Sequence, residues 1–373
     1  MKNVMAENSS IIKQITGSSD NPLFSNAIWE KIRMQAAIQG VPIQGHFELT
    51  PRCNLDCKMC YVHLKEEQMN GISELSIKEW KQIMDQAISE GMLFASLSGG
   101  ECLMHPFFDD IYTYLHSKGI MITILTNGLL LDKKIELFKR LPPVYVQVSV
   151  YGNSEEQYNS VTGRKCYGKV KENINNAIIN GLPVGIAITT SKYLKEVTDI
   201  IQYYKNKGIS VAVSRWLMPP YSSTGRTLDD FNLSAQEQVE VSKELLRVTK
   251  EESVRQADSN LEEKSNNINS SQGITCAAGR SDFSISWSGA MSMCVSLNKP
   301  TGFPLKEGFN KAWEKTKEAA RKFQMPIECV KCDYKRICNH CPAQHLVNAE
   351  PGHCSKVICE ETKLMVKAGI VSI

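Results

Sequence analysis

Cysteines arranged in two groups are the feature that most constrains this chain. It has 13 cysteines in 373 residues: Cys53, Cys57 and Cys60 form a C-x3-C-x2-C group, and eight more follow residue 273. The N-terminus lacks the basic and apolar regions of a signal peptide, so we expect a cytoplasmic protein whose thiols stay reduced. Clustered cysteines in such a chain indicate metal binding or catalysis rather than disulfides.

Composition excludes several other classes. Hydrophobic residues make up 42% of the chain, which is ordinary for a globular protein and too high for wholesale disorder. The formal net charge of +3 is too small for a protein that coats nucleic acid, so we expect no nucleic-acid partner. No apolar run approaches the roughly 18–20 residues that span a bilayer, so no membrane association is expected.

Between residues 45 and 220, short β-rich runs alternate with helical stretches. Six strands separated by crossover segments must pair in parallel, and right-handed crossovers curl such a sheet into a barrel. We therefore expect an α/β fold, a partial (β/α)6 TIM barrel with its chemistry in the loops after the strands. The expected strands are 46–49, 93–98, 121–126, 144–150, 184–190 and 209–217, and the expected helices are 25–39, 76–90, 106–118, 168–180 and 193–207.

The domain organisation follows from changes in composition. Residues 1–44 form an N-terminal segment, and 45–220 form the barrel. Residues 221–273 hold a helix and a polar linker, because 250–273 is charged and poor in large apolar side chains. Residues 274–373 combine eight cysteines with little periodicity. They are expected to form a small module stapled by metal rather than by a large core.

The first cysteine group lies in the loop after the first expected strand. Three thiolates on one short loop can hold three irons of a [4Fe–4S] cluster and leave the fourth iron open to an external ligand. A zinc site with His63 as the fourth ligand is the alternative.

This spacing resembles the cysteine motif of the radical S-adenosylmethionine (radical SAM) superfamily, and the similarity extends over residues 45–220. The resemblance implies that SAM chelates the open iron through its amino and carboxylate groups. It also implies reductive cleavage of SAM to a 5′-deoxyadenosyl radical that abstracts a substrate hydrogen. Met59 stands where the family usually has an aromatic residue beside the adenine. Its polarizable thioether can still pack on a ring.

Two further segments resemble parts of the family's SAM site. Gly99, Gly100 and Glu101 resemble the family's Gly-Gly-Glu motif, which implies that the glutamate receives the methionine ammonium. After the fourth expected strand, Ser149 and Arg164 resemble the segment that holds the ribose and the methionine carboxylate.

Asn127, after the third expected strand, is a ribose-side candidate of the same site. A turn role for Asn127 is the alternative.

The late cysteines do not suit a zinc ribbon, because only five residues separate their two C-x2-C pairs. Their order resembles the SPASM domain, an extension of certain radical SAM enzymes that carries two auxiliary [4Fe–4S] clusters. The metal-ligand candidates are Cys276, Cys294, Cys329, Cys332, Cys338, Cys341, Cys354 and Cys359.

The family's interleaved pattern implies how these thiolates are shared. Cys329, Cys332, Cys338 and Cys359 would hold the distal cluster, and Cys276, Cys294 and Cys341 the proximal one. Cys354 is then either the fourth proximal ligand or a bystander that leaves that iron open to substrate.

The resemblance implies an oxidoreductase that cross-links or oxidises a ribosomally made peptide. The alternatives are a small-molecule dehydrogenase, a sulfatase-maturase-like protein modifier and a non-catalytic electron carrier. Val295 stands where sulfatase-maturing members usually have an aspartate, which counts against that activity. Expected partners are the peptide, a separate leader-recognition protein and an electron donor such as flavodoxin or ferredoxin.

Overall fold

The part of the chain that the structure describes begins at Ala27. This computed structural model describes residues 27–225, 227, 231–249, 274, 276–335, 337–338, 341–348 and 353–371. The expected linker 250–273 and most of the N-terminal segment therefore lie outside the described residues. Within these ranges, no helix is long and apolar enough to cross a membrane.

The described strands form one sheet in the order β6-β5-β4-β3-β2-β1-β7-β8. Each neighbouring pair from β1 to β6 is parallel, which confirms the predicted six-stranded parallel arrangement. The strands are β1 (Gln44–Glu48), β2 (Phe94–Ser98), β3 (Met121–Thr126), β4 (Tyr145–Ser149), β5 (Val184–Thr189), β6 (Val211–Ser214), β7 (Asp282–Ile285) and β8 (Met291–Ser292).

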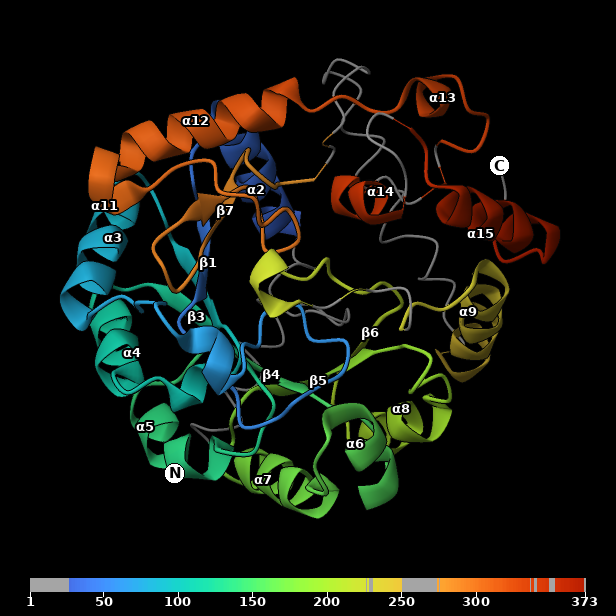
Figure 1. Ribbon diagram of the computed structural model, residues 1–373. Coiled ribbons are helices and arrows are strands. Elements are labelled where there is room, and N and C mark those ends of the chain that lie inside the picture. Colours follow the sequence, from blue (N-terminus) through green and yellow to red (C-terminus); the bar gives the residue numbers. More distant parts are fainter. Residues whose placement is uncertain are drawn as a thin grey trace.

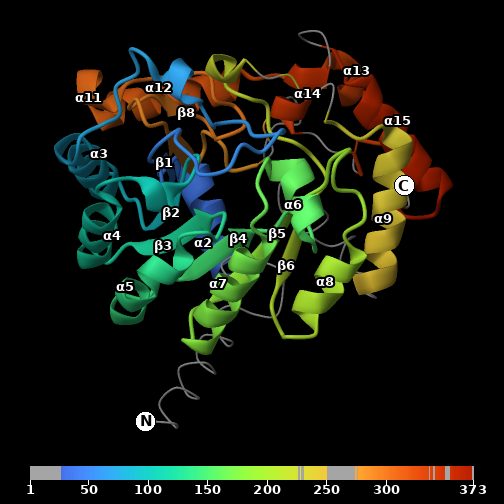
Figure 2. The same cartoon turned by 60° about the horizontal axis from the view of Figure 1, so that its bottom comes forward.

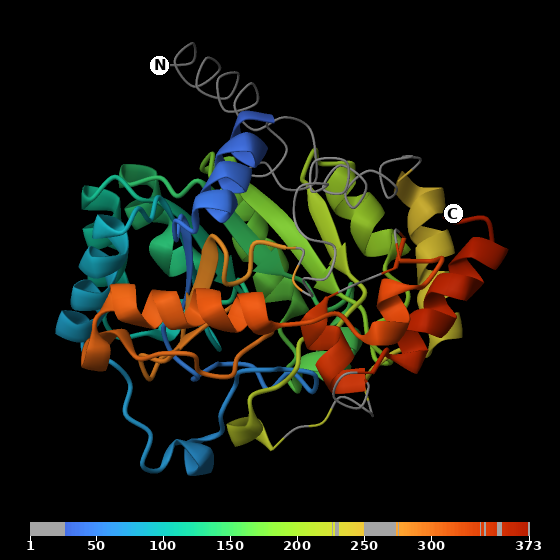
Figure 3. The ribbon, with the colours of Figure 1, turned by 90° about the horizontal axis from the view of Figure 1, so that it is seen from above.

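Helices surround this sheet on its outer side (Figures 1 and 2). They are α3 (Ile77–Ser89), α4 (Phe108–Ser117), α5 (Ile135–Arg140), α6 (Glu155–Thr162), α7 (Tyr167–Ile179), α8 (Thr198–Lys205) and α9 (Ala235–Thr249). The helix α2 (Ala27–Gln39) instead lies at the amino-terminal end of the barrel, where Ala36 packs with Ile43 and Phe94 (Figure 3). The α3 helix begins as its sequence predicts: Ser76 Oγ accepts from Glu79 N at 3.3 Å, and Glu79 Oε2 accepts from Ser76 N at 2.8 Å. The sequence analysis did not anticipate α6.

Short 3₁₀ helices lie in the loops of the barrel. They are η1 (Glu66–Met69), η2 (Cys102–Met104), η3 (Leu131–Lys134) and η4 (Ser222–Thr224).

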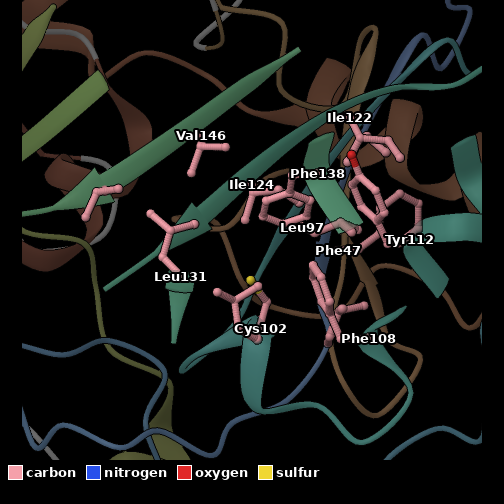
Figure 4. Packing of buried hydrophobic residues seen from close by; sticks show 14 of the residues in the cluster. Phe47, Leu97, Cys102, Phe108, Tyr112, Ile122, Ile124, Leu131, Phe138 and Val146 are labelled. Carbon is pink, nitrogen blue, oxygen red and sulfur yellow. The ribbon is translucent and has the colours of Figure 1, made fainter. Parts of the chain in front are cut away.

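The two faces of the strands differ in polarity. One set of alternate strand residues packs on the helices: Phe47 meets Trp80 of α3 edge-on, and Leu97, Ile124 and Val146 lie in one buried cluster with residues of α4 and α5 (Figure 4). Because side chains alternate along a strand, the other set lies on the opposite face, here called the lumen. It is mainly polar or small toward the carboxyl ends of the strands, whereas Phe94 and Met121 at the other end pack with α2. Residues of the lumen include His46, Glu48, Ser96, Ser98, Gln147, Asp282 and Ser284. Apolar layers fill ordinary TIM barrels, so this interior is better suited to polar ligands.

The C-terminal residues extend the barrel sheet beyond β1. β7 pairs with β1 in parallel, with Gln44 opposite Asp282, and β8 returns antiparallel to β7. The following helices are α11 (Pro304–Glu307), α12 (Phe309–Lys322), α13 (Ile327–Val330), α14 (Pro342–Asn348) and α15 (Lys356–Lys367). The region thus contributes a strand to the barrel sheet, which its weak periodicity did not predict.

At the other edge of the barrel, α15 packs on α9. Val239, Met365 and Ile370 form a buried cluster between them. Arg215, just after β6, pairs with the buried carboxylate of Glu361 on α15. The C-terminal helices therefore form an arc that runs from α12 to α9 (Figures 1 and 3).

Candidate functional site

The loop after β1 carries the first cysteine group and is anchored to α6. Asp56 N donates to Thr162 O at 3.0 Å, and Lys58 N donates to Val161 O at 3.0 Å. The last carbonyls of a helix have no partner within that helix. The loop supplies those partners, so its backbone is set by the end of α6.

The Gly99–Gly100 pair lets the next loop lie directly against the cysteine loop. Gly99 has a φ of 134°, and a Cβ at Gly100 would stand 2.4 Å from Arg52 O. Gly100 N donates to Thr50 O at 2.7 Å, and Glu101 N donates to Arg52 O at 2.8 Å. Both glycines are therefore required by the close approach of the two loops.

Glu101 is buried beneath the cysteine loop, with 1% of its surface exposed. Its carboxylate accepts hydrogen bonds from Thr126 Oγ1 at 2.8 Å, Asn127 N at 2.7 Å and Leu103 N at 3.1 Å. Burial raises the pKa of Glu101, and these three donors lower it in part. A carboxylate offers about four lone-pair positions, so one acceptor position remains for a ligand.

Asn127 and Arg164 both contact the cysteine loop at Asn54. Asn127 Nδ2 donates to Asn54 Oδ1 at 2.6 Å and lies 3.7 Å from Cys53 Sγ. Arg164 Nη1 donates to Asn54 O at 3.0 Å. Asn127 also accepts from Leu129 N at 3.0 Å, so it makes the turn contact as well as facing the thiol.

The remaining candidates of this group lie around the same loop. Met59 is buried within the loop itself. Ser149 is the last residue of β4, and its hydroxyl interacts with Tyr151. The sequence-derived candidates thus lie on loops at the carboxyl ends of β1 to β4.

The thiols of the loop receive backbone hydrogen bonds. Leu55 N lies 3.4 Å from Cys53 Sγ, and His63 N lies 3.3 Å from Cys60 Sγ. Burial and the neighbouring Glu101 raise the pKa of Cys53 to about 12, and metal binding would have to remove that proton. Within the described ranges, no three or more His, Cys, Asp or Glu side chains are gathered closely enough to hold a single metal ion. Three thiols on one loop, amide donors to sulfur and a buried acceptor at Glu101 fit a [4Fe–4S] cluster with an amine-bearing ligand.

The late cysteines separate into two sets in space. Burial raises the pKa of Cys294 to about 12, and the neighbouring Cys276 and Cys341 thiols contribute to that rise. Cys354 instead lies beside Cys359, with the two sulfurs 2.7 Å apart. The second set consists of Cys329, Cys332, Cys338, Cys354 and Cys359.

The sequence analysis missed a polar and aromatic group in the lumen. Glu48, at the end of β1, is completely buried, and Tyr221 Oη donates to its Oε2 at 2.5 Å. The ring of Tyr221 stacks on Tyr61 and meets Trp287 edge-on, with centroids 6.4 and 5.0 Å apart. The only sequence signal was a charged residue at an alternate position of a buried strand.

The family comparison covers this part of the chain. The sequence profile of the Radical SAM superfamily matches residues 47–194. The chain carries a radical SAM domain. That domain contains the Cys53 loop, Gly99–Glu101, Asn127 and Arg164, and radical SAM domains take a [4Fe–4S] cluster and SAM.

Curated relatives share the radical SAM domain. The antilisterial bacteriocin subtilosin biosynthesis protein AlbA of Bacillus subtilis is 29% identical over 181 residues, 48% of this chain and 40% of AlbA. The AdoMet-dependent heme synthase of Methanosarcina barkeri is 27% identical over 336 residues, 83% of this chain and 93% of that protein. The chain spans about two-fifths of the length of the first curated relatives it matches.

A solved radical SAM structure extends the likeness to the C-terminal region. Streptococcus suis SuiB bound to S-adenosylmethionine superposes with a TM-score of 0.66, covering 95% of this chain and 87% of SuiB. The two sequences are 15% identical, so this likeness shows the fold alone. It confirms the radical SAM fold with its partial barrel.

Proposed function

We propose that this chain is a radical SAM enzyme that cross-links or oxidises a ribosomally made peptide. One observation carries the proposal: the two cysteine regions approach one another across a single pair of rings. Tyr61 follows Cys60 directly, and its ring stacks on the ring of Tyr221. The Cys294 thiol lies close enough to Tyr221 to contribute to the raised pKa of the Tyr221 hydroxyl. A substrate in the lumen would therefore lie between the two groups of thiols.

In this proposal, Cys53, Cys57 and Cys60 hold the SAM-binding cluster. The remaining acceptor position of Glu101 receives the methionine ammonium, and Met59 packs beside the adenine. The guanidinium of Arg164 holds the methionine carboxylate. Ser149 and Asn127 face the ribose.

The proposal also assigns two [4Fe–4S] clusters to the C-terminal module, residues 274–373. Cys276, Cys294 and Cys341 serve the proximal cluster. Four of the second set serve the distal one, and Cys354, beside Cys359, is the thiol in excess of four. With these groups bound, the enzyme gains hydrogen-atom abstraction at the barrel and one-electron acceptance at the module.

Relatives support a peptide substrate. AlbA is named as a bacteriocin biosynthesis protein and SkfB as a sporulation killing factor maturation protein, and SuiB has been solved with its precursor peptide SuiA. A separate leader-recognition protein and a flavodoxin or ferredoxin donor remain part of this proposal.

A tetrapyrrole substrate is the second candidate, because the heme synthase match covers 93% of that protein. Tetrapyrroles of heme synthesis carry carboxylates. The buried Glu48 carboxyl would repel such groups only in its ionised form, so a tetrapyrrole would be admitted to the lumen while Glu48 is protonated.

The test is anaerobic turnover with SAM and a reductant. One arm supplies deuterated candidate precursor peptides, and the other supplies deuterated Fe-coproporphyrin III. Deuterium that appears in 5′-deoxyadenosine from the peptide alone supports the proposal. Transfer from the tetrapyrrole alone contradicts it and supports the second candidate.

A further inference from the structure

A carboxylate without a complete set of partners lies in the lumen. Glu48 has 0% of its surface exposed. Its Oε2 accepts a hydrogen bond from Tyr221 Oη, with the two oxygens 2.5 Å apart. Its Oε1 is buried and accepts no hydrogen bond of normal geometry from the described residues, although the Tyr61 hydroxyl lies close enough to the carboxyl to lower its pKa. A buried, unpaired oxygen costs free energy, so this atom is placed to receive a group from outside the chain.

The surroundings of Glu48 place it at the meeting point of the two cysteine regions. Tyr221 N donates to Tyr61 O at 2.8 Å, which joins the loops after β6 and β1. Trp287, just after β7, meets the Tyr221 ring from the C-terminal region. A substrate that reaches Oε1 would therefore lie near both thiol groups at once.

The charge state of Glu48 suits proton transfer near neutral pH. Burial raises its pKa to about 7, while Tyr221, Tyr61 and His46 lower it. These are the titratable groups that face it, and none of its contributing neighbours is a lysine or arginine. A carboxylate whose protonated form has a pKa near the working pH is an effective general base.

We propose that Glu48 is the catalytic base that takes a proton from the substrate through Oε1, and that Tyr221 is the positioning residue that orients it. The inference rests on the proposed function. A cross-link or a double bond removes two hydrogens from the substrate, and the adenosyl radical takes only one of them as an atom. The second leaves as a proton from a substrate X–H bond, whose electron pair stays on X, and that proton forms an O–H bond on Glu48. The remaining electron would go to a one-electron oxidant, a role that a [4Fe–4S] cluster held by Cys276, Cys294 and Cys341 would supply.

The sequence around the proximal thiols supports this assignment. Residue 295 follows Cys294 and is a valine, which cannot accept a proton. The Glu48 carboxyl is a proton acceptor near the same thiol, because Tyr221 contacts both Glu48 and the surroundings of Cys294.

The first experiment compares Glu48→Gln with wild-type holoenzyme, using the candidate precursor peptide that transfers deuterium in the wild-type assay. The introduced amide oxygen can still accept the Tyr221 hydrogen bond, so a merely structural role would leave turnover nearly unchanged. We expect 5′-deoxyadenosine within about twofold of wild type and modified peptide reduced by at least about a hundredfold. Asp282→Asn, which changes a buried lumen carboxylate at the opposite end of the β1–β7 pair, should keep product formation. Product at the wild-type level in Glu48→Gln overturns the proposal.

The pH dependence of product formation tests the role of Glu48 in the wild-type protein, without a substitution at that residue. The ratio of product to 5′-deoxyadenosine should rise with pH through about 7 in wild type. Tyr221→Phe removes a hydrogen bond that favours the ionised carboxylate, so its midpoint should move to higher pH. A midpoint that Tyr221→Phe does not move overturns the positioning role.

Infrared titration separates this inference from the proposed function, because it needs no substrate. A protonated-carboxyl band that disappears around pH 7 in wild-type holoenzyme and is missing in Glu48→Gln supports the base. Absence of such a band overturns it. A failure of the proposed function would instead appear as no deuterium transfer from the peptide, whatever the infrared result.

Discussion

The two cysteine regions differ in what holds their thiols in place. The loop with Cys53, Cys57 and Cys60 is fastened by backbone hydrogen bonds to the end of α6 and to residues 100–101. It rests on a large apolar core shared by the strands and the outer helices (Figure 4). The barrel therefore positions these thiols by its own packing.

The C-terminal thiols have much less support of this kind. The buried apolar cluster around Cys294 and Cys341 consists of Ile274, Ala278, Met293, Leu297, Ala320 and Ala343, of which three are alanines. Small cores contribute little stability, and metal binding in such modules is also folding free energy. The barrel positions its cluster site by its own packing. In the module, Phe283, Phe309 and Trp313 pack into the main core, whereas the segments around Cys294 and Cys341 have only this small cluster, which the proposed auxiliary cluster would reinforce.

The largest expected effect comes from replacing Cys53, Cys57 and Cys60 together with alanine. SAM cleavage should fall to background, and about four of about twelve irons per chain should be lost after reconstitution. Of the three thiols only Cys57 belongs to the buried barrel core, so hydrogen exchange in β1 to β6 should stay close to wild type. Unchanged iron, or stoichiometric zinc, would contradict the assignment of this loop.

Replacing a proximal thiol tests what the C-terminal module contributes to turnover. Cys294→Ala should still cleave SAM to 5′-deoxyadenosine but yield no modified peptide, because the electron acceptor is lost. Cys166→Ala, which changes a buried thiol in the barrel, is the matched control and should make product.

Circular dichroism and residual iron on the Cys294→Ala sample distinguish loss of the acceptor from unfolding of the module. A folded variant that lacks proximal iron and still completes turnover would refute the electron-acceptor role.

Glu101→Gln should have an intermediate effect that is confined to the barrel. The substitution keeps the shape but removes the charge that receives the methionine ammonium, and such a hydrogen bond is worth about 1.5–3 kcal/mol. SAM affinity should fall roughly ten- to a hundredfold with the cluster still assembled. Calorimetric titration measures this. Thr126→Val, which removes one neutral donor to Glu101, should weaken binding less.

The smallest effect is a pH dependence of stability that arises in the lumen. The pKa of Glu48 is about 7 in the folded protein and about 4.3 when unfolded. Between these values the unfolded state binds fewer protons, so stability falls as pH rises and levels off above about 7. The Tm of wild type relative to Glu48→Gln should therefore fall by a few degrees between about pH 5 and pH 8. An unchanged difference would show that Glu48 is not buried in its free acid form.

Much of the barrel could be predicted because its signals are local. Period-2 strands, helix caps and the C-x3-C-x2-C and Gly-Gly-Glu segments depend on residues close together in the chain. The boundaries of β2 to β5 differ from expectation by a residue or so, whereas β6 is shorter than the expected 209–217. The α6 helix was missed because its eight residues carry only a weak apolar pattern.

The sequence by itself determined the two cysteine groups, the parallel sheet and the position of the first group after β1. Only the tertiary structure decided that β7 pairs with β1, that Cys354 lies beside Cys359, and that Tyr221 meets Glu48 across 173 positions of sequence. These contacts join distant segments, and their partners are selected by register and burial, which no local pattern encodes. A charged residue in a strand reveals its role only when the fold shows what lies beside it.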